Sequence, residues 1–255
     1  MTDVRFAVIG RGRAGGSFQA ALVHRGADCV AMLGRGDDPA TLDTTLDLVI
    51  VAVPDRAIAD VAEHVPTGPL VVHLSGATDL RSLRAHHERC GSLHPLVSLT
   101  DSERGAAALL AGPHMAVAAP TPELVAEVRS IAELLGAQTF IVDDNRRASY
   151  HAAASVAANH LVGLVAQVER IADADGLPLA PFTTMMRAVI DNIDHVGVAA
   201  SLTGPVARGD WDTVRAHLAA TDPADHGLYI ALAQACATLA GHALPADLFP
   251  TESPR

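Results

Sequence analysis

The stretch AVIGRGRAGGSF, residues 7–18, places a short apolar run directly before three glycines spaced as G-x-G-x-x-G. The apolar run predicts a strand over residues 4–10, and the residues after the glycines predict a helix over 14–25. A glycine loop between a first strand and a helix is typical of the turn that holds the pyrophosphate of a dinucleotide. The stretch therefore predicts a nucleotide-binding sheet, with a purely structural turn as the alternative.

Each residue of this loop has its own part in that prediction. Gly10 allows the tight turn, Gly12 lets the backbone approach a pyrophosphate, and Gly15 permits close packing of the helix on the strand. Arg13 and Ala14 begin the helix, whose unpaired N–H groups would face the phosphates. We therefore assign these five residues to cofactor binding.

The remainder of the first 145 residues alternates apolar runs with helical segments. Runs rich in Val and Leu, typical of buried parallel strands, occupy residues 28–33, 46–54 and 68–75, and further strands are expected at 91–94, 114–119 and 138–143. This alternation predicts an α/β fold over residues 1–145, in the form of a Rossmann sheet that is doubly wound and mostly parallel.

The character of the sequence changes near residue 145. Residues 146–173 carry Ala, Leu and Val around most of the helical circumference and no proline, which predicts one long, largely buried helix. Further helices are expected over 180–195, 210–220 and 225–241. Residues 146–255 are thus predicted to form an all-helical C-terminal domain for substrate binding and dimerisation.

Composition excludes several classes of function. The chain has 255 residues, 49% of them hydrophobic, and its apolar runs stop short of the roughly 20 residues of a membrane span, so we expect a cytoplasmic protein with no membrane partner. The net charge of −11 disfavours nucleic acid as a partner. Three widely separated cysteines fit a reducing compartment, and we assign no metal ligands. No lysine is present, which excludes a Walker loop and a catalytic lysine.

The end of the second predicted strand decides between NAD and NADP. An NAD site usually places an acid there for the ribose 2′-hydroxyl, but this chain reads Leu33, Gly34, Arg35. Arg35 is therefore the leading ligand for the 2′-phosphate of NADP(H), and Arg11 or Arg13 could lie over the adenine. A solvated Arg35 is the alternative.

NAD stays open as a second choice, because Asp37 and Asp38 follow only slightly later. The ends of the next two strands complete the expected cofactor site. Val53 and Pro54 should border the adenosine and nicotinamide side, and Ser75 and Gly76 should approach the nicotinamide ribose, because ligands bind outside the carboxyl ends of the strands.

His94 is the leading candidate among thirteen histidines for proton transfer. It ends the predicted strand in GSLHPL, where Pro95 stiffens the turn, and histidine ordinarily titrates near neutral pH. His151, Ser155 and Asn159 are spaced by four along the long helix and form one polar stripe. These three side chains either satisfy one another or face the nicotinamide.

A third signal lies in SLTGPVARGDWDTV, residues 201–214. Thr203 belongs to a turn before a helix that Asp210 would cap, and the loop offers Arg208. Arginine is a natural bidentate ligand for a carboxylate, so Arg208 and Thr203 are assigned to substrate binding together with Ser155. A contact between Arg208 and Asp210 or the helix terminus is the alternative.

Six segments together resemble a known family. In order, VIGRGRAGGSF, LVIVAVPD, HLSGA, GSLHPL, YHAAASVAANH and LTGPVARGD resemble Rossmann-like NADP-dependent oxidoreductases with a C-terminal helical domain of unknown function. That family is similar in layout to prephenate dehydrogenases, pyrroline-5-carboxylate reductases, ketopantoate reductases and F420-dependent NADP reductases. The resemblance covers nearly the whole chain and implies a C-terminal domain of the 6-phosphogluconate-dehydrogenase type.

The resemblance also suggests roles for single residues. Ser75 and the His94–Pro95 pair resemble the serine and the HP motif that prephenate dehydrogenases place beside substrate and nicotinamide. Asn159 resembles the asparagine that hydroxyacid dehydrogenases place one helical turn after their catalytic lysine, and Ser155 stands at the position of that lysine. His94 or His151 must therefore supply the proton if the reaction is reductive.

These observations predict an enzyme, namely an NADPH-dependent reductase of a small carboxylated carbonyl compound, with 2-dehydropantoate (ketopantoate) as a specific candidate. His94 would polarise or protonate the carbonyl oxygen, Asn159 would orient the reactants and Arg208 would bind the carboxylate. A non-catalytic NADP-binding sensor and an F420-dependent NADP reductase are the alternatives. Because related folds bury the long helix against its twin, we expect a homodimer through the C-terminal domain.

Overall fold

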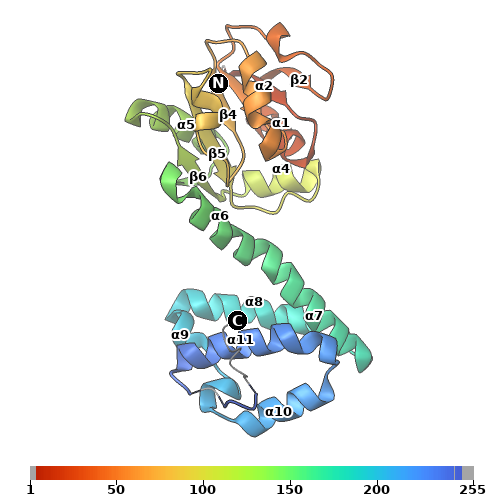
Figure 1. Ribbon diagram of the computed structural model, residues 1–255. Helices are drawn as coiled ribbons and strands as arrows, with labels where there is room; N and C mark the ends of the chain where they lie inside the picture. Colours follow the sequence, from red (N-terminus) through yellow and green to blue (C-terminus); the bar gives the residue numbers. More distant parts are fainter. Residues whose placement is uncertain (1–3, 244, 249–255) are drawn as a thin grey trace. The chain divides into compact units, whose positions relative to one another are not determined.

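The computed structural model describes residues 4–243 and 245–248. It divides into two compact units, residues 1–158 and residues 159–255, which we call the N-terminal and C-terminal units (Figure 1). None of the helices in the described part of the chain has the length and apolar character needed to cross a membrane.

The N-terminal unit is built on a seven-stranded sheet in the order β2-β1-β3-β4-β5-β6-β7. The strands are β1 (Arg5–Ile9), β2 (Asp28–Leu33), β3 (Leu48–Val51), β4 (Leu70–His73), β5 (Cys90–Pro95), β6 (His114–Ala118) and β7 (Gln138–Ile141). The first five strands run parallel, β6 pairs antiparallel with β5, and β7 runs parallel to β6. The mostly parallel, doubly wound sheet predicted from the sequence is confirmed.

Helices cover both faces of this sheet, which explains why its strands are apolar without alternation. The helices are α1 (Arg13–His24), α2 (Ile58–His64), α3 (Arg81–Arg84), α4 (Ser102–Leu110) and α5 (Pro122–Leu134). In β1, Phe6 and Val8 pack in a core with residues of α1, α4 and α5, whereas Ala7 and Ile9 pack with residues of α2 and α3. Because successive side chains of a strand point to opposite faces of the sheet, β1 contributes to two separate cores.

The strand order places a switch point beside the glycine loop. β1 pairs with β2 on one side and with β3 on the other, so the chain changes direction across the sheet between these neighbours. Ligands of doubly wound sheets bind at such a point, outside the carboxyl ends of the strands. The loop after β1 and the loop after β3 therefore lie where a nucleotide is expected.

A continuous helical segment follows the sheet. It consists of α6 (Arg147–Ser155), a π-helical turn (Val156–His160) and α7 (Leu161–Ala174). The long helix is confirmed, but its predicted burial is wrong for the single chain. Only Arg147, Gln167 and Ala172 are buried along it, and Val162 is 70% exposed. Apolar content indicates which residues favour burial, but it does not indicate whether another part of the same chain buries them.

Within its described residues, the C-terminal unit adds four α-helices to α7. They are α8 (Ala180–Val196), α9 (Val198–Ser201), α10 (Trp211–Ala220) and α11 (Pro223–Ala240), which confirms the three helices expected beyond residue 179. Arg170 of α7 forms a 2.5 Å ion pair with the buried Asp225 of α11, and Gln167 Nε2 donates to the Asp225 carbonyl at 2.7 Å. Both contacts join α7 to α11.

The units divide after residue 158, whereas the sequence placed the domain boundary at residue 145. Arg147 explains why α6 stays with the sheet. Its side chain is only 3% exposed, and Nε donates to Asp144 Oδ1 at 2.6 Å while Nη1 donates to the Ser75 carbonyl at 3.4 Å. A buried guanidinium needs such partners, so the start of α6 is tied to the carboxyl end of β4.

Candidate functional site

The glycine loop has the geometry that the sequence motif requires. Gly10 adopts φ +116°, and a Cβ built on it would lie 2.2 Å from the Ala52 carbonyl oxygen that follows β3. A Cβ on Gly15 would lie 1.9 Å from the Gly10 carbonyl oxygen. Neither position can accept a side chain without a shift of the backbone, so both glycines are required for packing.

Gly12 differs from its two neighbours because nothing lies within 4 Å of its Cβ position. It is the N-cap of α1 and supplies no side-chain hydrogen bond to the first turn. Arg13, the first residue of α1, is exposed, and Ala14 behind it is half-buried. The first turn thus presents backbone N–H groups to open space, as phosphate binding at a helix N-terminus requires.

The end of β2 carries an ion pair that the sequence did not indicate. Arg11 Nε donates to the Met32 carbonyl at 3.0 Å, and its Nη2 lies 3.1 Å from Asp37 Oδ2. The same Asp37 oxygen accepts the Gly34 N–H at 2.7 Å. Arg35 projects from this turn, exposed and with no ion pair among the described residues. Asp37, the acid nearest the expected ribose site, is therefore already paired with Arg11, whereas Arg35 forms no ion pair with another described residue.

The carboxyl ends of β3 and β4 are joined by a hydrogen bond. Val53 is half-buried and Pro54 is exposed in the turn after β3. Asp55 Oδ2 then accepts the hydroxyl proton of Ser75 at 2.7 Å, and Ser75 Oγ accepts the Thr78 N–H at 2.9 Å. The Ser75 hydroxyl is thus already hydrogen-bonded within these turns, so Ser75 contributes to the site through its backbone.

Three aromatic side chains gather beside Gly76, directly after Ser75. The His94 ring lies 5.6 Å from Tyr150 and 6.0 Å from His151, both on α6, in edge-on arrangements. The hydroxyl of Tyr150 lies 2.5 Å from His94 Nδ1. A Cβ on Gly76 would lie 2.9 Å from His94 Nε2 and 2.7 Å from His151 Cδ2. The structure therefore brings His94 and His151 together, with a glycine in front of them.

The second nitrogen of His94 is available to a ligand. In the described ranges Nε2 has no hydrogen-bond partner, and the buried side-chain nitrogens that lack a partner there belong to His73 and Arg129. His94 Nε2 is therefore unpaired and reached by solvent. A hydrogen-bond donor or acceptor of a bound molecule could meet it beside Gly76.

Burial changes the charge state expected for His94. Desolvation first, then the charges of His151 and Arg147, lower its pKa to about 4, while Asp55 raises it. Burial raises the pKa of Tyr150 to about 12. At neutral pH the pair therefore holds a neutral imidazole and a neutral phenol, which differs from the ordinary histidine titration assumed from the sequence.

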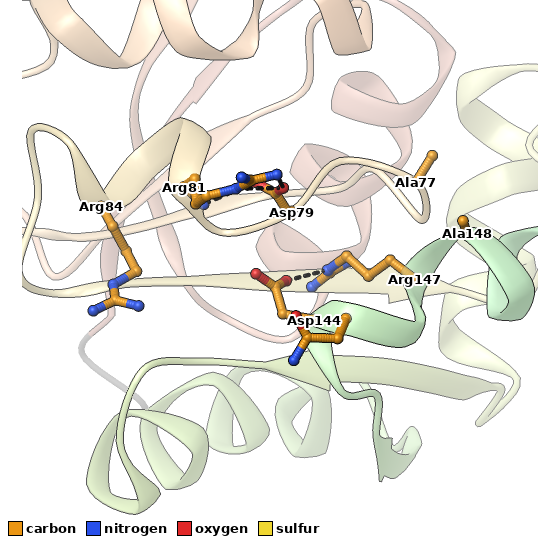
Figure 2. Close-up of a pocket in the computed structure, with 8 residues that line it drawn as sticks. Ala77, Asp79, Arg81, Arg84, Asp144, Arg147 and Ala148 are labelled. Atoms are coloured by element: carbon orange, nitrogen blue, oxygen red, sulfur yellow. Dashed lines mark hydrogen bonds and ion pairs between the residues drawn. The ribbon is translucent and has the colours of Figure 1, made fainter.

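A polar cavity of about 590 Å³ is lined in part by Arg147 and Ala148, at the start of the helix that carries Tyr150 and His151 (Figure 2). Its lining consists of Ala77, Asp79, Arg81, Arg84, Asp144, Asn145, Arg147 and Ala148. Arg147 pairs with Asp144 inside it, and Arg81 pairs with Asp79 at its exposed side. Since Arg147 also donates to the Ser75 carbonyl and to the Ser92 hydroxyl, it connects the cavity to the ends of β4 and β5.

Comparison with known proteins finds a family model that matches part of the chain. Residues 114–236 match the family model described as "Domain of unknown function (DUF2520)". Residues 114–236, slightly less than half of the chain, are similar to this family, and the seven-stranded sheet of the N-terminal unit is Rossmann-like. This confirms the resemblance to Rossmann-like proteins that carry a C-terminal domain of unknown function.

Solved structures share this fold over almost the whole chain. A Bacteroides fragilis protein, BF3122, provisionally described as an NADP oxidoreductase, is 21% identical with a TM-score of 0.79 over 92% of this chain and 98% of its own. Protein TM1727 of Thermotoga maritima is 25% identical with a TM-score of 0.70 over the same shares. The pyrroline-5-carboxylate reductase of Streptococcus pyogenes is 15% identical with a TM-score of 0.63, over 92% and 99%. No protein with a curated function matches the sequence.

The matched DUF2520 region contains the remaining predicted site residues. Ser155 is half-buried at the end of α6, and Asn159 is exposed in the π-helical turn. Thr203 and Arg208 are exposed before α10, and Asp210 caps that helix as predicted, since it accepts the Thr213 N–H at 3.2 Å. Ser155 lies in the N-terminal unit, whereas Asn159, Thr203 and Arg208 lie in the C-terminal unit.

Sequence reasoning assigned no role to Tyr150, Asp55 or Arg147. Tyr150 stands beside His151 in YHAAAS, and Asp55 follows Val53 and Pro54, so both were adjacent to predicted residues. Their partners are 56 and 20 positions away in the chain. The packing of α6 on the sheet brings Tyr150 to His94, and the pairing of β3 with β4 brings Asp55 to Ser75.

Proposed function

We propose that this protein binds NADPH and reduces a small carboxylated carbonyl compound. The observation that carries the proposal is the arrangement along one edge of the sheet. An open glycine loop follows β1, and the unpaired Nε2 of His94 lies beside Gly76 after β4. A phosphate-binding turn and a polarising imidazole at the carboxyl ends of parallel strands suit a nicotinamide-dependent reductase.

The residues of the loop fit a dinucleotide with a 2′-phosphate. Gly12 and the first turn of α1 would hold the pyrophosphate, and the free guanidinium of Arg35 would bind the 2′-phosphate. Asp37 is paired with Arg11, which weakens it as a ligand for a ribose hydroxyl. Val53, Pro54 and the backbone of Ser75 would border the nicotinamide side. NADPH supplies a hydride when bound.

His94 would polarise the carbonyl through Nε2, with His151 as its neighbour on α6. A neutral imidazole can act in this way without becoming an imidazolium, as it does in triosephosphate isomerase. Asp55 and Ser75 hold the turn that places Gly76 in front of both rings. The missing side chain at Gly76 leaves space for a substrate oxygen beside Nε2.

The proposed substrate class rests on Arg208. Arg208 is exposed and forms no ion pair with another described residue, although its charge acts on Asp210. It would bind the carboxylate, with Thr203, Ser155 and the amide of Asn159 as further polar groups. The pyrroline-5-carboxylate reductases that share this fold carry a carboxylate in the name of their substrate. Small 2-oxo acids, ketopantoate first, are therefore the compounds to test.

We also propose a homodimer formed through the C-terminal unit. None of the 17 residues of α8 is buried in the single chain, although the helix carries Met185, Val189, Ile190 and Val196. An apolar face that stays largely exposed in the single chain is unusual for a helix of a globular unit. A second copy of the chain would cover it.

Binding measurements test the cofactor assignment. Arg35→Ala is expected to weaken NADPH binding by roughly 10-fold to 100-fold and to leave NADH binding unchanged, because a charge-assisted hydrogen bond contributes about 1.5 to 3 kcal/mol. Arg89→Ala, at the opposite edge of the sheet before β5, removes the same charge and should bind NADPH as the wild type does. Equal affinity of the wild type for NADH and NADPH contradicts the assignment.

Turnover is tested separately by following NADPH oxidation with a series of 2-oxo acids. His94→Gln should retain NADPH binding and lose at least about 100-fold in kcat with any compound that the wild type reduces. NADPH binding without turnover would instead indicate a sensor. Hydride transfer between F420 and NADP would indicate an F420-dependent NADP reductase.

A further inference from the structure

Tyr150 is the only described residue that hydrogen-bonds the imidazole of His94. Its hydroxyl lies 2.5 Å from Nδ1, and its ring meets the His94 ring edge-on with an interplanar angle of 88°. Phe140 of β7 also packs against Tyr150, with 5.9 Å between ring centroids, so two rings contact the phenol. The contact therefore comes from a fixed side chain.

The chemistry of the two groups sets the direction of this hydrogen bond. A phenol is a good donor and a poor acceptor, whereas an imidazole nitrogen without a proton is a strong acceptor. The pKa of each group leaves both uncharged at neutral pH, so the phenol has a proton to donate and the ring has one bare nitrogen. If Nδ1 accepts from Tyr150, the single ring proton must be on Nε2.

We infer that Tyr150 is a positioning residue that holds His94 in the tautomer with its proton on Nε2, facing Gly76. This inference rests on the proposed function only for its consequence, which is a hydrogen-bond donor aimed at a substrate oxygen. His151 and Arg147 of α6 and Asp55 after β3 are the other charged or titratable groups that act on His94. None of these three donates to or accepts from its ring, so Tyr150 alone sets the tautomer.

The same pair accounts for the proton that reduction of a carbonyl requires. When bound, NADPH would supply the hydride for the new C–H bond. The carbonyl oxygen, which gains the C=O π pair, would take the Nε2 proton of His94. The hydroxyl proton of Tyr150 would move to Nδ1, and the phenolate would take a proton from water, which leaves a hydroxide ion in the solvent. His94 thus changes tautomer without becoming charged, and the proton comes finally from solvent.

The tautomer can be read directly from the full-length protein without substrate or cofactor. Long-range ¹H–¹⁵N correlation spectra of protein labelled with ¹⁵N-histidine distinguish protonated from unprotonated ring nitrogens, and His94→Gln identifies the His94 signals. In the wild type we expect a protonated Nε2 and a bare Nδ1. In Tyr150→Phe, which keeps the packed ring, both nitrogens should move toward the average of two exchanging tautomers.

The chain offers a matched control, because its other tyrosine also pairs with a histidine. The Tyr229 hydroxyl lies 2.8 Å from His217 Nδ1 in the C-terminal unit. Tyr229→Phe should alter the His217 signals and leave those of His94 unchanged. A proton on Nδ1 of His94 in the wild type, or an unchanged His94 pattern in Tyr150→Phe, overturns the inference.

Kinetics separate this inference from the proposed function. If the wild type reduces a carbonyl compound, Tyr150→Phe should lower kcat by roughly 10-fold to 100-fold with little change in KM, whereas Tyr229→Phe should match the wild type. Unchanged kcat in Tyr150→Phe contradicts the positioning role. If no compound is reduced by the wild type, the proposed function fails, and the spectra still decide the tautomer.

Discussion

At the scale of single residues, the three glycines of the nucleotide loop are required for different reasons. Gly10 and Gly15 leave room for backbone atoms, because a Cβ on either would lie within 2.2 Å of a carbonyl oxygen. Gly12 faces open space and has the ordinary φ of −76°. Its lack of a side chain therefore matters only to a molecule that occupies that space.

This difference predicts opposite outcomes for two alanine variants. Gly15→Ala should lower the free energy of unfolding by about 1 to 3 kcal/mol, because its methyl group overlaps the backbone of Gly10. Gly12→Ala should stay within about 1 kcal/mol of the wild type but weaken NADPH binding at least roughly 10-fold. Urea unfolding and cofactor titration measure the two effects. A Gly12→Ala variant with unchanged NADPH affinity would contradict the assigned position of the pyrophosphate.

At the scale of secondary-structure elements, the helical segment that follows the sheet has two unusual features. Its α-helical pattern is interrupted by a π-helical turn at Val156–His160, a feature that is frequent at functional sites. The turn includes Asn159 and spans the point where the two compact units divide. The helix α8 beyond it exposes Met185, Val189 and Val196, whose spacing of four and seven places them along one face.

A dimer through α8 makes a specific prediction for a charged variant. Val189→Asp should convert a dimer to a monomer, because a carboxylate buried against an apolar partner is costly. Val23→Asp on α1 is the matched control, since both valines are 44% exposed in the single chain. It should leave the dimer intact. Light scattering coupled to gel filtration measures the mass, and a monomeric wild type at micromolar concentration would rule out the dimer.

At the scale of the whole molecule, buried polar groups are concentrated in the N-terminal unit. His73 of β4 is fully buried, accepts the Ser75 N–H on Nδ1 at 3.2 Å, and has no partner for Nε2 in the described part of the chain. Burial, and then the charge of Arg147, lower the pKa of His73 to about 4. His94 has the same lowered value. The unit thus holds two histidines that resist protonation when folded.

These two groups predict that acid begins to destabilise the N-terminal unit at a pH above the range in which carboxylates titrate. Between pH 6.5 and about 4 the unfolded chain binds protons on His73 and His94 that the folded chain does not, so the free energy of unfolding should fall as pH falls. Each histidine should contribute on the order of 2 kcal/mol over this range.

Hydrogen exchange of β4 and β5 amides in urea measures this unit, while the fluorescence of Trp211, the single tryptophan, follows the C-terminal unit separately. His73→Gln should remove about half of the pH dependence, and His86→Gln, at an exposed position, should remove none. A stability that stays constant from pH 6.5 to 4.5 would show that the two histidines protonate freely.

The sequence alone determined the sheet, the glycine loop and most helix positions, because these depend on local patterns. A strand buried on both faces must be apolar throughout, as in Leu48–Val51, and a loop that approaches its own backbone must contain glycine, as at Gly10 and Gly15. His94 could be singled out in the same way, since it ends a strand at the edge where ligands bind.

The tertiary structure alone decided what surrounds those residues. Tyr150 meets His94 across 56 positions, Asp55 holds Ser75, and burial gives His94 a pKa of about 4. The tertiary structure also showed that the long helix over α6 and α7 is mostly exposed in the single chain. Hydrogen-bond partners and desolvation arise from contacts between distant segments, and the spacing of residues along the chain does not record those contacts.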